Sequence, residues 1–430
     1  MSEVQTPPKA PAARAAERGA APPSPADLRA MRRTLTAASD SQVRQVVALV
    51  DEMTQRGVAD ALIEPLRRRL VQLRPPRRLR FERLLFLPLD PLMVQARDWQ
   101  PFGPTIPRTA IMPLGRLVRI ALGRDVARID ALIAGRRTSD ATVIEEAGAL
   151  LWPQAGRILA IAPQPMEWPD SGLNTTVYRP IATGVAAVLS RHAAIESLVR
   201  DACSGVLGDG EEAITAMIAG MAEDTPETQT ILIALLLARL PQSGALLRVL
   251  AGTGVTGAFR RNAEGATDAL VDLLERPAGL EARIGGVGLD AAAIEIRRLG
   301  SFLAELEARG ADHKRRSRMR ALRQRLDASC QTRFTEGLNE SLLTPMQAMA
   351  GSIDRPVQTL METTARHLRE LETEARQIGG GETYDAQLRQ TVAAVRAMAG
   401  TGGLSPMRAV RLVEILAGSE AAMTLLEPGA

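Results

Sequence analysis

Apolar residues recur every three or four positions along most of this chain of 430 residues, a spacing typical of amphipathic helices. One series near the N-terminus comprises Val43, Val46, Val47, Val50 and Met53. A second and longer series comprises Met319, Leu322, Leu326, Cys330, Phe334 and Leu338. The pattern predicts an all-α protein, either a multi-helix bundle or an irregular helical array. We expect the second series to pack on another helix, of the same chain or of a partner, within a long helical stretch from Leu289 to about Leu343.

Proline and glycine divide this helical pattern into segments. Residues 1–24 are rich in Pro and Ala and have little to bury, which predicts a disordered tail. Residues 277–288 contain four Gly and one Pro and are predicted to form a loop. The breaks indicate two or three helical domains, which we place at residues 25–174, 175–288 and 289–430.

Two segments of the first domain cannot be continuous helix. Residues 86–113 contain six prolines around Trp99 and Phe102, and residues 163–174 contain three more around Trp168. In one interpretation, Trp99 and Phe102 hold an irregular connection against the helical core. In the other, an exposed aromatic side chain anchors an interface.

Charge is concentrated in two short stretches. Residues 67–83 and residues 309–333 each carry a net charge of +7, whereas the whole chain carries +4. Candidate anion- or partner-binding residues are Arg67, Arg68, Arg69, Arg74, Arg77, Arg78, Arg80, Arg83, Lys314, Arg315, Arg316, Arg318, Arg320, Arg323 and Arg325. Basic segments on an otherwise acidic chain are typical of proteins with an anionic partner.

The same arginines also allow a structural interpretation. They could pair with acidic helices of the same chain, for which Glu370, Glu372 and Glu374 are candidates, or with a protein partner. Residues 309–333 contain no aromatic side chain for stacking on bases, so nucleic-acid binding is the weaker of the two hypotheses.

The sequence does not indicate catalysis, a cofactor or a metal. Gly252–Gly257 match G-x-G-x-x-G, but no strand is predicted before them, and we interpret them as a helix end and a loop. His192 and Cys203 are eleven residues apart on one predicted helix, too far for a catalytic pair. No histidines have the spacing of metal ligands.

Several features indicate a cytoplasmic protein. Cys203 and Cys330 form no disulfide framework, the N-terminus lacks an apolar signal region, and no apolar run approaches the length of a transmembrane segment. Of 53 basic residues only Lys9 and Lys314 are lysine, and this arginine-rich composition is typical of a GC-rich bacterial genome.

Our leading hypothesis is a non-enzymatic interaction or scaffold protein that self-associates through residues 290–343. The candidate interface residues are Trp99, Phe102, Met319, Leu322 and Leu326. One alternative is a nucleic-acid-associated protein that uses the two Arg-rich segments. The other is an enzyme with an active site near the Trp-bearing loops.

Overall fold

The computed structural model describes residues 43, 46–50, 76–204, 210–252, 255–276, 279–285, 287–309, 313–348, 355–401 and 404–425. The chain divides into two compact units, Met1–Leu70 and Val71–Ala430. In the first unit the described residues are helical, and Val43, Val47 and Val50 are buried, as their spacing predicts. The predicted tail at residues 1–24 lies outside the described residues.

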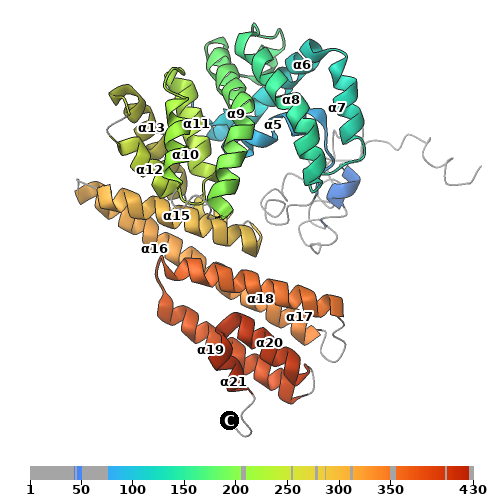
Figure 1. Ribbon diagram of the computed structural model, residues 1–430, viewed down its shortest axis with the longest axis vertical. Helices are drawn as coiled ribbons and strands as arrows, with labels where there is room; N and C mark the ends of the chain where they lie inside the picture. The colour runs from blue at the N-terminus through green and yellow to red at the C-terminus, as the bar shows by residue number, and fades with distance from the viewer. Residues whose placement is uncertain are drawn as a thin grey trace, which may run out of the picture. The chain divides into compact units, whose positions relative to one another are not determined.

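The described residues of the second unit are almost entirely helical (Figure 1), which confirms the all-α prediction. Its first helices are α5 (Phe81–Phe86), α6 (Ile111–Leu122), α7 (Asp125–Ile133) and α8 (Ala141–Ile161). They are followed by α9 (Tyr178–Ser204), α10 (Glu211–Ala219), α11 (Pro226–Arg239), α12 (Ser243–Ala251), α13 (Gly257–Glu275) and α14 (Gly279–Ile284). The last are α15 (Leu289–Arg309), α16 (His313–Glu336), α17 (Thr344–Ala348), α18 (Arg355–Arg376), α19 (Gly381–Gly400), α20 (Pro406–Ala417) and α21 (Ser419–Met423).

Capping residues explain where several of these helices begin. Thr225 accepts a hydrogen bond from the backbone N–H of Thr228 at the start of α11, and Pro226 occupies the first helical position, where its missing N–H costs nothing. Thr256 caps α13 in the same way through Phe259. The glycine motif at 252–257 therefore lies between two helices, and the residues before it form α12 rather than a strand.

The proline-rich segments form short elements. Residues 87–110 contain the 3₁₀ helices η3 (Leu87–Leu92), η4 (Ala96–Asp98) and η5 (Arg108–Ala110), together with the two-residue parallel strands β1 (Met93–Val94) and β2 (Ile106–Pro107). The second segment contains η6 (Trp168–Ser171) and leads into η7 (Thr175–Val177). Trp168 is fully buried, and its indole N–H donates to the carbonyl of Asn174 at 3.1 Å. Burial of Trp168 thus holds the irregular connection between α8 and α9 against the core.

Two predicted elements differ from the structure. Residues 289–343 are not one long helix, because α15 ends at Arg309 and α16 begins at His313, and the two helices contact one another. An ion pair between Glu307 and Arg323 at 3.1 Å joins positions on either side of this break, as expected of an antiparallel hairpin. A π-helical turn, η8 (Gly337–Leu343), connects α16 to α17. The predicted loop at 277–288 contains α14, which packs on α16.

Helices of the second unit pack both on the next helix in the chain and on helices further along it. Figure 1 shows α8 beside α9 and α11 near α13, while α18 packs against both α15 and α20. Buried apolar side chains from Leu79 to Ala422 form one continuous hydrophobic core. The predicted domain boundaries near residues 174 and 288 stay predictions. None of the described helices is both long enough and apolar enough to cross a membrane.

Candidate functional site

The first Arg-rich segment is partly described. Arg67, Arg68, Arg69 and Arg74 lie outside the described residues. The others, Arg77, Arg78, Arg80 and Arg83, lie on the approach to α5 and on α5 itself.

The backbone of this approach pairs with residues 136–138, which follow α7. The N–H of Leu79 donates to the carbonyl of Arg136 at 2.7 Å, and the N–H of Thr138 donates to the carbonyl of Arg77 at 2.8 Å. The backbone of the segment thus ties the start of α5 to the end of α7.

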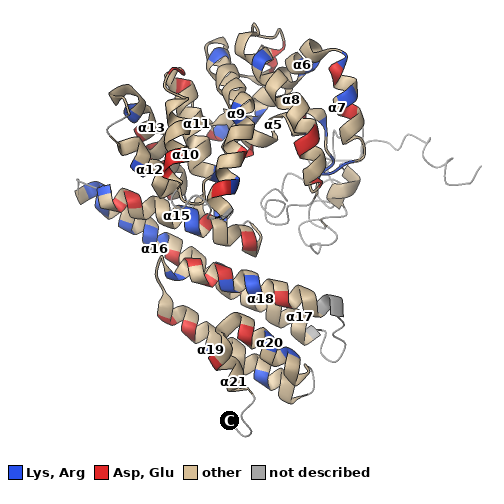
Figure 2. Ribbon diagram, in the orientation of Figure 1, with Lys and Arg blue, Asp and Glu red and all other residues tan. Residues whose placement is uncertain are grey.

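The second Arg-rich segment is bound largely to its own chain. On α16, Arg318 pairs with Asp272 and Glu275, and Arg315 approaches Asp268 at 3.6 Å. The three carboxylates recur at spacings of four and three along α13, so they share one face of that helix. Figure 2 shows how basic and acidic residues are distributed over the helices.

Other arginines of this segment bind backbone carbonyls. Arg325 donates to the carbonyls of Glu275 and Arg276, at 3.0 and 3.2 Å, where α13 ends. Arg333 donates to Val287 at 2.9 Å. Arg323 pairs with Glu307 and also donates to the carbonyls of Gln377 and Ile378, both at 3.2 Å, beyond the end of α18. The carbonyls of Glu275, Gln377 and Ile378 lie at or just beyond the C-terminal end of a helix, where backbone carbonyls lack partners within that helix.

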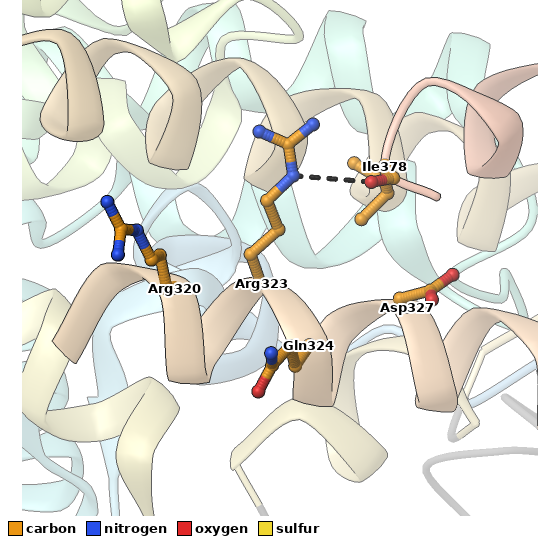
Figure 3. A pocket seen from close by; sticks show the side chains of 5 residues that line it. All are labelled: Arg320, Arg323, Gln324, Asp327 and Ile378. Atoms are coloured by element: carbon orange, nitrogen blue, oxygen red, sulfur yellow. Dashed lines mark hydrogen bonds between the residues drawn. The ribbon is translucent and has the colours of Figure 1, made fainter. Parts of the chain in front are cut away.

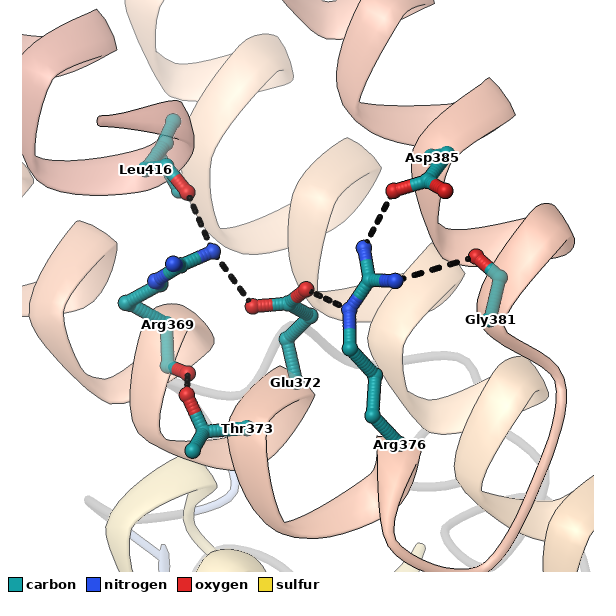
Figure 4. A network of polar contacts seen from close by, with 7 residues as sticks. All are labelled: Arg369, Glu372, Thr373, Arg376, Gly381, Asp385 and Leu416. Atoms are coloured by element: carbon teal, nitrogen blue, oxygen red, sulfur yellow. Dashed lines mark hydrogen bonds and ion pairs between the residues drawn. The ribbon is translucent and has the colours of Figure 1, made fainter. Parts of the chain in front are cut away.

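The acidic partners suggested by the sequence were wrong. Glu372 is buried and pairs with Arg369 at 2.7 Å and with Arg376, both on its own helix (Figure 4). Arg376 also binds Asp385 of α19, and this hydrogen bond lowers the pKa of the Asp385 carboxyl. Glu374 pairs with Arg297 of α15. Within the described part of the chain, no ion pair joins Glu370, Glu372 or Glu374 to α16.

The apolar series on α16 packs inside the chain. Met319, Leu322 and Leu326 are each at most 2% exposed, and α16 contacts α14, α15, α18 and α19. Burial against another helix is therefore confirmed for this series. The same burial means that these three side chains form no exposed interface in the folded chain.

The side chains of Trp99 and Phe102 differ in how far they are exposed. Trp99 packs against the core, and its indole N–H donates to the carbonyl of Thr105 at 3.0 Å. Phe102 lies inside the loop that this bond closes, yet its side chain is 58% exposed. Its backbone φ is 61°, and it is the one non-glycine residue with positive φ in the described part of the chain.

Two exposed methionines lie on segments connected to this loop. Met112, in the first turn of α6, is 51% exposed, and Met166, two residues before η6, is 96% exposed. Both η5 and α6 contact η6. Phe102, Met112 and Met166 are thus exposed apolar side chains on segments that follow or contact one another, and we refer to these three residues together as the loop patch.

A surface hollow of about 230 Å³ lies between α16 and the residues after α18 (Figure 3). It is lined by Arg320, Arg323, Gln324, Asp327 and Ile378. Figure 3 shows Arg320, Arg323 and Asp327 spaced along α16, with Ile378 above the helix between Arg323 and Asp327. Arg320 and Arg323 are predicted anion-binding residues, whereas sequence reasoning missed Asp327 and Ile378 as site residues.

His192 and Cys203 lie on one helix, α9, as predicted. The His192 ring makes an edge contact with Trp152, with centroids 4.1 Å apart, and its Nε2 is 3.7 Å from Glu196. Burial lowers the pKa of His192 to about 4. Cys203 is exposed and Cys330 is buried, where burial raises the pKa of its thiol to about 12. Among the described residues, no group of three or more His, Cys, Asp or Glu side chains could hold a metal ion.

Comparison with protein-family models, with curated proteins and with solved structures found no match. The sequence did give Phe102 as a candidate interface residue, but no pattern of residue types reports its positive φ. The acidic face of α13 did have a signal, since Asp268, Asp272 and Glu275 follow helical spacing.

Proposed function

We propose that the chain is a self-associating helical scaffold protein whose contact surface includes the loop patch. The observation that supports this most strongly is the conformation of Phe102, a bulky residue with a φ of 61° and a largely exposed ring.

Both features of Phe102 are unfavourable in an isolated chain. A left-handed backbone costs a non-glycine residue roughly 1–2 kcal/mol, and burying a Phe side chain would stabilise the protein by about 1.5–3 kcal/mol. Residues held in unfavourable backbone conformations are concentrated at binding and switching sites. A protein partner that covers the ring would recover the burial energy that the fold leaves unused.

The chemistry of the loop patch suits a second copy of the same chain. Its three side chains are uncharged, so two copies of the patch do not repel one another electrostatically. Methionine side chains are flexible and adapt to an opposing surface. A twofold dimer brings the same patch of both subunits together, which is the commonest symmetry among soluble oligomers.

The nucleic-acid alternative is less well supported. Arg315, Arg318 and Arg323 already pair with carboxylates of the chain, and an anionic polymer would have to displace those partners. Arg325 and Arg333 bind backbone carbonyls.

The test compares the molar mass of variants by size-exclusion chromatography with light scattering. Phe102→Gly removes the ring, and Leu360→Ala is the matched control, because Leu360 is 64% exposed on α18. We expect the wild type and Leu360→Ala to give the same mass above that of one chain, and Phe102→Gly to shift toward one chain. Unchanged association in Phe102→Gly would show that the loop patch is not the contact surface.

A further inference from the structure

The hollow beside α16 has opposite charges at its two ends. Arg320 and Asp327 are seven residues apart on α16, which separates them by about 10 Å along the helix axis at 1.5 Å per residue. Both line the hollow, together with Ile378 from the segment after α18. The hollow thus runs from a basic end to an acidic end past an aliphatic side chain (Figure 3).

At the basic end, guanidinium donors remain available. Arg320 makes no hydrogen bond or ion pair with any residue that the structure describes. Arg323 is held by Glu307 and by two backbone carbonyls, which use three of the five N–H donors of a guanidinium. Two like charges three residues apart on a helix repel one another, and an anionic group between them would remove that repulsion.

At the acidic end, a carboxylate oxygen lacks a donor. The Oδ1 atom of Asp327 is buried and has no hydrogen-bond partner. The carboxylate lies against the turn at Gly379 and Gly380, where an added Cβ would come within 3.1 Å of Oδ2 and 2.9 Å of Oδ1 respectively. Glycine at both positions therefore lets the turn approach this carboxylate closely, and a carboxylate with a buried oxygen that has no partner favours a ligand that donates to it.

From these contacts we infer that the hollow binds a small dipolar molecule, with a carboxylate at one end and a primary ammonium at the other. The carboxylate accepts from Arg320 and Arg323, the ammonium donates to Asp327, and an alkyl chain between them contacts Ile378. A volume of about 230 Å³ is below the usual range for drug-sized ligands, about 300–1,000 Å³, so the ligand is of amino-acid size. This site is independent of the proposed self-association.

The test uses three probes that differ only in their charged ends, measured by isothermal titration calorimetry on the full chain. The probes are 6-aminohexanoate, hexanoate and hexylamine. Because hydrogen bonds to charged groups are stronger than those between neutral groups, we expect 6-aminohexanoate to bind at least about tenfold more tightly than either singly charged probe.

Two variants assign the ends, and a third is the control. Arg320→Ala should remove the preference for 6-aminohexanoate over hexylamine, and Asp327→Asn should remove its preference over hexanoate. Arg128→Ala, an exposed arginine of α7, should bind as the wild type does. Absence of binding to the wild type at millimolar 6-aminohexanoate would overturn the inference. Equal wild-type affinities for hexanoate and 6-aminohexanoate would also overturn it. So would wild-type probe preferences in both Arg320→Ala and Asp327→Asn.

Discussion

His192 is a partly buried histidine that the fold keeps neutral near pH 7. Its side chain is 13% exposed, next to Trp152, Glu196 and Arg239, and Glu196 is itself paired with Arg239 at 2.5 Å. Burial has the largest effect on the pKa of His192 and lowers it to about 4, although the Glu196 charge acts in the opposite direction. The folded chain therefore takes up a proton at His192 at a lower pH than the unfolded chain does.

The consequence is a loss of stability in mild acid. The histidine contributes fully above its ordinary pKa of 6.5, and its contribution falls as the pH drops from 6.5 to about 4. At 1.36 kcal/mol per pH unit, the loss reaches about 3 kcal/mol. We expect urea denaturation of His192→Phe to show a smaller fall in unfolding free energy across this range than the wild type. Parallel pH profiles of the two proteins would contradict the assignment.

For a substitution at Phe102 we predict a gain in the free energy of unfolding rather than a loss. Substitution by Gly relieves about 1–2 kcal/mol of backbone strain and loses about 0.5–1 kcal/mol to the greater freedom of the unfolded chain. At concentrations where the chain is monomeric, Phe102→Gly should thus be more stable than the wild type in urea denaturation, by up to about 1.5 kcal/mol. Phe102→Ala keeps the strain and should show no gain. A Gly variant no more stable than the Ala variant would mean that the backbone is unstrained.

Among the helices, α16 shows what the sequence could and could not predict. The spacing of Met319, Leu322 and Leu326 predicted a buried face, because burial of a helix follows from its own periodicity. The hairpin with α15 and the pairing of Arg318 with α13 depend on which helices meet in space, and helical spacing within one segment does not report this. For the same reason Asp327 could be counted as a charge, but its position opposite Ile378 could not be foreseen.

Because α16 packs inside the chain, we predict that a substitution that creates a cavity beneath it lowers the free energy of unfolding substantially. Leu326 is fully buried, and Leu→Ala substitutions at such sites cost about 2–5 kcal/mol. Chemical denaturation of Leu326→Ala should show a loss in this range. Ser317→Ala, at an exposed position of the same helix, should stay within about 0.5 kcal/mol of the wild type. A loss below 1 kcal/mol for Leu326→Ala would contradict the packing described for α16.

For the molecule as a whole, arginines of α16 join helices to one another through ion pairs and hydrogen bonds, a role that the net charge does not reveal. The chain carries +4, but many described basic groups of α16 are paired internally. We expect heparin and duplex DNA to bind weakly in fluorescence titrations, with a shallow dependence on salt. Each phosphate neutralised would contribute a slope of about 0.9 in log affinity against log salt, so a slope of several units would favour the nucleic-acid alternative.

Self-association through a surface that one chain leaves exposed is tested most directly by sedimentation equilibrium of the wild-type chain of 430 residues over a wide concentration range. One chain has a mass of 46.1 kDa. We predict a weight-average mass that rises with concentration toward twice this value, since the loop patch suits a twofold contact. A mass that stays at 46.1 kDa at every concentration would contradict it.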